Sequence, residues 1–290
     1  MTRPDLLLLD VGGTFIKSAL GCSSRGAAEG TFLSVPISSD GSREEISEAF
    51  RTAVSQQLVR AAEDGLAIEA ICVAIPGPFD YNNGIFMMKH KFAAVYGVSF
   101  REILGDIASG MRLAFVHDVN GALLGALTAN PQLKDGNVAI STFGTGLGFA
   151  YAENGTVMKS PTGSPAKDLW NMPYGGGILE DYVSRRGILR LYEEQGGVLA
   201  EGEDVKEIAM KARAGEEKAM EAFRSAGRHY AAGAKEMIES LGIRHLLFAG
   251  QIARSFDLME GEIRAGLGKG TEVSVLDDIQ GTVLIGAASL

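Results

Sequence analysis

"LLLLDVGGTFIKSAL" occupies residues 6–20 and joins an apolar run to an aspartate, two glycines, a threonine and a lysine. Four consecutive leucines are typical of a buried strand, and the apolar residues after the glycines indicate a second strand. A glycine-rich turn between strands can point several backbone N–H groups outward, and such a nest binds anions. Tight hairpins also need glycine, so the turn by itself leaves a binding role and a structural role open.

A similar unit recurs in the middle of the chain, where residues 138–155 read "VAISTFGTGLGFAYAENG". Elsewhere apolar strands alternate with helices. The helix expected over residues 41–65 begins with Ser42 and Glu45 at capping-box spacing. We also expect helical structure from Gly177 through about residue 241. This alternation predicts an α/β fold, and the repeated unit predicts two related halves.

Neither glycine turn belongs to the two best-known nucleotide motifs. A Walker P-loop needs glycine directly before its lysine, whereas Ile16 precedes Lys17. The segment "GTGLGFA" spaces its glycines as G-x-G-x-G and is followed by a strand, so it is not a dinucleotide fingerprint. Phosphate binding therefore rests on the turns themselves and on the hydroxyl groups of their threonines.

Two aspartates, Asp10 and Asp118, end apolar strands. In a doubly wound sheet, ligands bind beyond the carboxyl ends of the strands. A carboxylate beside a phosphate nest repels the phosphate unless a cation lies between them, so Asp10 predicts Mg²⁺ held largely through water. Asp118 is predicted to be the base that deprotonates a substrate hydroxyl. The alternative is that Asp118 only caps the helix that follows it.

Charge and cysteine content narrow the class of protein. The net charge of −9 over 290 residues, with no basic run, argues against nucleic acid or an anionic membrane as a partner. Cys22 and Cys72 are the only cysteines, which favours free thiols in a reducing compartment. With neither a signal peptide nor an apolar segment of about eighteen residues, we expect a cytoplasmic protein.

Five segments, taken together in this order and spacing, resemble the ROK family of bacterial sugar kinases and regulators: "DVGGTFIKSAL", "AIPGPFDYNNGIF", "HDVNGALLGA", "STFGTGLGF" and "FAGQIARS". The resemblance implies an α/β fold of two actin-like (ribonuclease H-like) domains with an interdomain cleft. Residues 1–116 would form a smaller N-terminal domain, with the terminal helix 279–290 packing back on it. Residues 117–278 would form a larger C-terminal domain.

The same resemblance implies ATP and Mg²⁺ as cofactors, a sugar substrate and a homo-oligomer, most simply a dimer. Asp118 matches the catalytic base of the family. The residues expected at the nucleotide are Asp10, Gly12, Gly13, Thr14, Lys17, Gly144, Thr145 and Gly146 around the phosphates, and Gly250 and Gln251 on the adenosine side. The residues expected at the sugar are Gly77, His90, His117 and Glu180.

Three departures from the family pattern concern the sugar side. His117 stands where the family places asparagine, and "KDLW" (residues 167–170) replaces an E-x-G-H motif. "NMPYGGGILE" (residues 171–180) replaces a cysteine-rich zinc loop, so we expect no zinc. Lys167 in place of the glutamate would suit a sugar with an anionic or modified group; alternatively, Lys167 faces solvent.

The sequence therefore predicts an ATP-dependent hexose kinase, with phosphoryl transfer from Mg-ATP to a sugar hydroxyl and Asp118 as base. The alternative is a non-catalytic sugar-binding sensor or regulator of the same family without a DNA-binding domain. We expect no helix-turn-helix before the first strand, which begins near Asp5.

Overall fold

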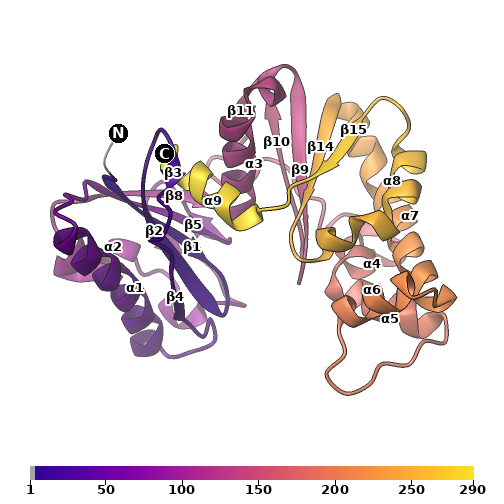
Figure 1. Ribbon diagram of the computed structural model, residues 1–290, viewed down its shortest axis with the longest axis horizontal. Coiled ribbons are helices and arrows are strands. Elements are labelled where there is room, and N and C mark those ends of the chain that lie inside the picture. Colours follow the sequence, from indigo (N-terminus) through magenta and orange to yellow (C-terminus); the bar gives the residue numbers. More distant parts are fainter. Residues whose placement is uncertain (1–3) are drawn as a thin grey trace. The chain divides into compact units, whose positions relative to one another are not determined.

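The computed structural model describes residues 4–290, which form two compact units (Figure 1). Unit 1 extends to Pro131 and adds Val157–Ala166 and Gln280–Leu290; unit 2 comprises Gln132–Thr156 and Lys167–Ile279. Helix α3 (Asp118–Ala129) thus groups with unit 1, whereas the sequence prediction assigned residues from 117 onward to the second domain. Residues 1–3 of the predicted first domain lie outside the described residues.

Unit 1 is built on a six-stranded sheet in the order β3-β2-β1-β5-β8, with β4 also paired to β2. Strand β1 is antiparallel to β2, and β1, β5 and β8 are parallel. The carboxyl ends of these three strands therefore meet at one edge of the sheet. The strands are β1 (Leu6–Val11), β2 (Phe15–Cys22), β3 (Gly26–Ala27), β4 (Leu33–Pro36), β5 (Ala70–Ile75) and β8 (Arg112–His117), with a separate hairpin of β6 (Phe79–Asp80) and β7 (Ile85–Phe86).

Alternation along β1 divides its leucines between the two faces of the unit 1 sheet. Leu7 and Leu9 are buried in a core with Phe50 of α1, while Leu6 and Leu8 are buried in a second core with Leu284 of α9. A run of four leucines is thus apolar throughout because both faces are covered. The helices of this unit are α1 (Arg43–Glu63), α2 (Phe100–Leu104), α3 and α9 (Ile279–Ala288), with 3₁₀ turns η1 (Ala93–Val95) and η2 (Gly105–Ala108).

Unit 2 repeats this sheet topology. Its order is β11-β10-β9-β14-β15, in which β9 and β10 form an antiparallel hairpin and β9, β14 and β15 are parallel. The predicted repeat of strand, glycine turn and strand thus corresponds to the same position in two similar sheets. The strands are β9 (Asn137–Phe143), β10 (Leu147–Glu153), β11 (Thr156–Val157), β14 (Ile243–Ala249) and β15 (Glu272–Val275).

The helical half of unit 2 is more divided than the sequence predicted. Residues 173–178 form a short hairpin, and residues 195–204 form a helix-free connection in which Gly196 and Gly202 have positive φ. Residues in that left-handed region end helices, which explains the interruption. The elements are η3 (Pro131–Lys134), β12 (Pro173–Tyr174), β13 (Gly177–Ile178), α4 (Glu180–Val183), α5 (Arg185–Glu194), α6 (Val205–Arg213), α7 (Glu217–Ser240), η4 (Ile252–Leu258) and α8 (Glu260–Leu267).

Other local predictions are confirmed. The fold is α/β, and the capping box of α1 forms: the Glu45 N–H donates to Ser42 Oγ at 3.2 Å, and the Ser42 N–H donates to Glu45 Oε2 at 2.8 Å. Helix α3 begins at Asp118, with His117 as its N-cap. Across residues 4–290, no helix is both long enough and apolar enough to cross a bilayer.

Candidate functional site

Two carboxylates lie at the carboxyl edge of the unit 1 sheet. Asp10 is on β1, directly opposite Lys17 of β2, and Asp118 follows the last residue of β8. Burial raises the pKa of Asp10 to about 6; the Lys17 ammonium partly opposes this effect, and the Asp118 charge adds to it. The two aspartates therefore act on each other electrostatically, as expected from strands that end at the same edge.

Asp118 is held in its charged form. Burial by itself would raise its pKa, but His117, the Val119 N–H and the Lys91 ammonium outweigh burial and leave the pKa below its usual range. Asp118 Oδ1 lies 2.8 Å from His117 Nδ1 and accepts the Val119 N–H at 2.8 Å. The Asp118 side chain is 38% exposed, so an ionised carboxylate faces accessible space.

The first glycine turn is anchored by its own backbone. The Gly12 N–H donates to Phe15 O at 2.9 Å, and the carbonyls of Gly13 and Thr14 accept from the N–H groups of Ser39 and Ile37. Gly12 and Thr14 are exposed. Because the hairpin uses the Gly12 N–H, a phosphate at this turn would depend on the later residues of the turn and on the Thr14 hydroxyl.

The residues expected at the sugar are only partly brought together. A Cβ built on Gly77 would lie 3.4 Å from His117 Nε2 and 3.2 Å from the Tyr81 hydroxyl, so these three residues adjoin one another. His90 is exposed, and it is the neighbouring Lys91 whose charge acts on Asp118. Sequence reasoning missed Lys91 and Tyr81; the only signal for Lys91 was its place next to His90.

A segment of unit 1 that is remote in sequence, residues 157–166, supports this edge of the sheet. Asn120 Nδ2 donates to Gly163 O at 3.2 Å, and the Tyr81 N–H donates to Thr162 O at 3.0 Å. Asn120 is fully buried, and its Oδ1 finds no hydrogen-bond partner among residues 4–290. The first turn of α3 is thus held by a hydrogen bond to the loop of residues 157–166. The sequence pattern did not predict this contact.

The second glycine turn, Gly144–Gly146 in unit 2, rests on Glu180. Glu180 Oε2 accepts the Leu147 N–H at 2.9 Å, and a Cβ on Gly146 would come within 2.7 Å of the same oxygen. The other carboxylate oxygen, Glu180 Oε1, accepts from Arg186 at 2.9 Å. The residue expected to bind sugar is therefore also a support of the predicted phosphate turn.

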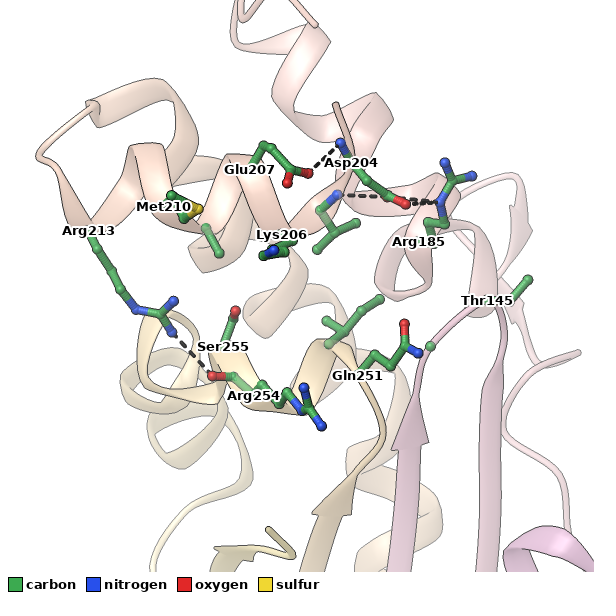
Figure 2. A pocket seen from close by; sticks show the side chains of 14 residues that line it. Thr145, Arg185, Asp204, Lys206, Glu207, Met210, Arg213, Gln251, Arg254 and Ser255 are labelled. Carbon is green, nitrogen blue, oxygen red and sulfur yellow. Dashed lines mark hydrogen bonds and ion pairs between the residues drawn. The ribbon is translucent and has the colours of Figure 1, made fainter. Parts of the chain in front are cut away.

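A pocket of about 640 Å³ adjoins this turn within unit 2. Gly250 has a φ of +99°, and a side chain there would collide with the backbone of Phe143, so only glycine fits. Gln251, Gly144 and Thr145 line the same pocket, and their expected roles at the adenosine and the phosphates stay predictions. Figure 2 shows Thr145 and Gln251 at one end of the pocket, Met210 and Arg213 at the other, and Lys206 between them.

The pocket is cationic although the chain is acidic. Four basic and two acidic residues line it: Arg185, Lys206, Arg213, Arg254, Asp204 and Glu207. Arg185 pairs with Asp204 at 2.8 Å, and Arg213 pairs with Asp257. In the described part of the chain, Lys206 and Arg254 have no carboxylate partner. The positive charges of Lys206 and Arg254 therefore favour an anionic ligand.

The donor set of unit 1 fits magnesium. No group of three or more His, Cys, Asp or Glu side chains gathers among residues 4–290. Magnesium commonly needs only one or two carboxylates, with water and substrate phosphates as its remaining ligands. Asp10, whose pKa is raised by burial despite the Lys17 ammonium on the neighbouring strand, supplies one such carboxylate. The expected lack of zinc stays a prediction; Lys167 and Trp170 are exposed at the replaced motif.

Solved structures share this fold over almost the whole chain. A ROK hexokinase from Thermus thermophilus is 22% identical, with a TM-score of 0.74, and the match covers 98% of this chain and 96% of the other. A ROK family glucokinase from Streptomyces griseus, in complex with glucose and AMPPNP, is 19% identical, with a TM-score of 0.75 and coverage of 98% and 97%. The chain has the ROK fold.

This ROK fold also occurs in a regulator. A ROK family transcriptional regulator, a homologue of the E. coli MLC protein, is 16% identical, with a TM-score of 0.81, and the match covers 98% of this chain and 78% of the regulator. No family model matches the sequence, and no curated protein sequence does. Because kinases and a regulator share the fold, the function has to be argued from the site.

Proposed function

We propose that this protein is a ROK family sugar kinase that transfers the γ-phosphoryl group of Mg-ATP to a hydroxyl group of a hexose. The observation that carries the proposal is Asp118, an ionised and partly exposed carboxylate at the carboxyl edge of the sheet. Phosphoryl transfer to an alcohol needs such a base beside the substrate hydroxyl. The glucokinase with the same fold was solved with glucose and an ATP analogue, which supports this choice of substrates.

In the proposed reaction the sugar lies against Gly77 and His117, and its reacting hydroxyl donates a hydrogen bond to Asp118. As the hydroxyl oxygen attacks the γ-phosphorus, its proton passes to Asp118 and the bond to the leaving ADP breaks. Backbone N–H groups of the first glycine turn and the Thr14 hydroxyl would stabilise the charge on the transferring group. Glu180 contributes by supporting the second turn.

The unit 2 pocket is proposed to take the adenosine part of the nucleotide. Its volume falls within the range of small-molecule sites. Lys206 and Arg254, which have no carboxylate partner among residues 4–290, would attract the phosphates of the same nucleotide rather than its uncharged adenosine. Asp10 would hold Mg²⁺ through water, with Lys17 beside it. When bound, the ion would neutralise part of the phosphate charge.

A sugar-binding regulator is the second candidate, because a ROK regulator has the same fold. A sensor needs to bind sugar but has no use for a base. The ionised state of Asp118, maintained by His117, Val119 and Lys91, therefore favours catalysis.

The test is ADP release from Mg-ATP across neutral hexoses, N-acetylhexosamines and sugar acids. We expect one sugar to stimulate release strongly. Asp118→Asn should lower kcat by about 10³-fold, since general-base catalysis contributes about 10²–10⁴-fold. Asp64→Asn, a change at an exposed aspartate that ends α1, is the matched control and should retain activity. Equal activity in Asp118→Asn and the wild type would refute the mechanism; binding of a sugar without turnover would favour the sensor.

A further inference from the structure

His117 Nδ1 has two polar neighbours, and they require opposite protonation states. It lies 2.8 Å from Asp118 Oδ1 and 3.2 Å from the Val119 nitrogen. As an acceptor it would cap α3 by receiving the Val119 N–H. As a donor it would give a hydrogen bond to the Asp118 carboxylate. A neutral imidazole nitrogen can do only one of these.

The distances favour the donor. Two lone pairs facing each other at 2.8 Å repel, so a proton must lie between Nδ1 and Oδ1. His117, the Val119 N–H and Lys91 keep the Asp118 carboxyl ionised against the effect of burial. A carboxyl group gives up its proton far more readily than a neutral imidazole N–H does, so the proton in the 2.8 Å contact stays on His117 Nδ1. The Val119 N–H still has a hydrogen-bond acceptor, because Asp118 Oδ1 lies nearer to it, at 2.8 Å.

The other nitrogen of the ring then has a free lone pair. With Nδ1 protonated, neutral His117 presents Nε2 as an acceptor toward Gly77. The Tyr81 hydroxyl beside it donates to Ile75 O at 3.0 Å, so its proton is committed elsewhere. A Cβ on Gly77 would lie 3.2 Å from the Tyr81 hydroxyl and 3.4 Å from His117 Nε2, so the lack of a side chain there lets these groups pack closely.

We propose that His117 is a positioning residue for Asp118: its Nδ1–H fixes Oδ1, so that Oδ2 receives the substrate proton. The catalytic part rests on the proposed kinase function, whereas the protonation of His117 does not.

The tautomer of His117 is a direct test that needs no activity. The chain has four histidines, so ¹⁵N-histidine spectra at about pH 8, where imidazoles are mostly neutral, can be assigned with His117→Asn. We expect His117 to be protonated at Nδ1, and this preference to weaken in Asp118→Asn. A signal from the Nε2–H tautomer would make His117 a helix cap only and would overturn the proposal.

Kinetics test the consequence for the reaction. His117→Phe removes both ring nitrogens, and we expect kcat to fall by about 10–100-fold, as for other residues that orient a reactive group. His117→Asn can still donate one bond to Asp118 and should recover part of the loss. The matched control is His245→Asn, because His245 Nδ1 also faces a carboxylate, Glu272 Oε2 at 3.3 Å, but on β14 and β15. His245→Asn should leave kcat unchanged.

The pH profile distinguishes positioning from a structural role. Without the His117 Nδ1–H, the pKa of Asp118 rises, so the acid limb of kcat/KM should move to higher pH in His117→Phe. The other charged groups that act on Asp118 are Lys91, from the segment after β7, and Asp10, on β1; both stay in place. A change in KM alone, with kcat and the acid limb unmoved, would contradict the proposal. If no sugar stimulates the wild type, the kinase function fails and the tautomer alone decides the His117–Asp118 arrangement.

Discussion

Asp10 and Asp118 end strands of one sheet, yet their surroundings push their pKa values in opposite directions. Burial dominates at Asp10, whose pKa rises to about 6. At Asp118 the bonds from His117 and Val119, with the Lys91 charge, overcome burial. Carboxylates with separated pKa values are typical of sites that divide roles between them. Asp118 is suited to act as a base, and Asp10 to bind a cation.

The raised pKa of Asp10 makes a prediction about stability. The folded state holds this proton up to about pH 6, whereas the unfolded chain releases it near the ordinary aspartate pKa of 3.8. The free energy of unfolding should therefore fall as pH rises between about 4 and 6. Asp10→Asn removes the buried charge and should stabilise the protein by about 1–3 kcal/mol at neutral pH, and by nothing at about pH 4.

Urea unfolding of Asp10→Asn and the wild type at several pH values, with EDTA present, measures this difference. The chelator matters because a bound cation would itself favour the ionised carboxylate. A gain in stability that is equal at all pH values would show that Asp10 is not the titrating group.

The contact between α3 and α9 depends on glycine. A side chain on Gly125 would collide with the Thr282 carbonyl, and one on Gly286 would collide with the Gly121 carbonyl. The two helix backbones therefore touch directly, and α9 is held against the helix that begins with Asp118. This packing shows how the C-terminal segment joins unit 1.

Gly125→Ala should lower the free energy of unfolding by about 2–3 kcal/mol, because the two backbones must separate. The control is Gly261→Ala in α8, where nothing lies within 4 Å of the added Cβ. That change should stabilise the protein by up to about 1 kcal/mol through helix propensity. Chemical denaturation of both variants gives the comparison. Similar effects of both substitutions would show that the close helix contact is not formed.

Over the molecule as a whole, two sheets of the same topology carry different chemistry. The edge of unit 1 holds the aspartates, while unit 2 holds a pocket with an excess of positive charge despite the net charge of −9. Local charge, rather than net charge, determines which small ions each unit attracts. The dimer and the cytoplasmic location remain predictions.

Hydrogen exchange should distinguish nucleotide binding in the unit 2 pocket from the role of Asp118 in unit 1. We expect AMPPNP to slow exchange at the backbone of residues 144–147 and 250–255, because bound nucleotide would cover these walls of the pocket. Asp118→Asn should keep this protection, since Asp118 belongs to unit 1. Unchanged exchange at both segments under saturating nucleotide would rule out the unit 2 pocket as the adenosine site.

Much of the fold follows from local signals. Apolar runs, glycine turns and the Ser42–Glu45 box predict the strands, hairpins and first helix, because the period of side chains along a strand or helix is local. The sequence pattern is a poorer guide where side-chain hydrogen bonds determine the path of the backbone. Helical structure was expected from Gly177, but residues 173–178 form a hairpin. The Ile178 N–H donates to Asp181, and the Tyr182 hydroxyl donates to Gly175 O.

From the sequence by itself come the α/β class, the two glycine turns and the aspartates at strand ends, since each depends on neighbours a few residues away. Tertiary structure alone decided that His117 faces Asp118 with one nitrogen and Gly77 with the other, and that Glu180 lies beneath Gly146. It also decided that Lys206 joins Gln251 around one pocket. Apart from the contact between the neighbours His117 and Asp118, these contacts join residues far apart in the chain, and hydrophobic period and turn propensity carry no information about which distant side chains meet.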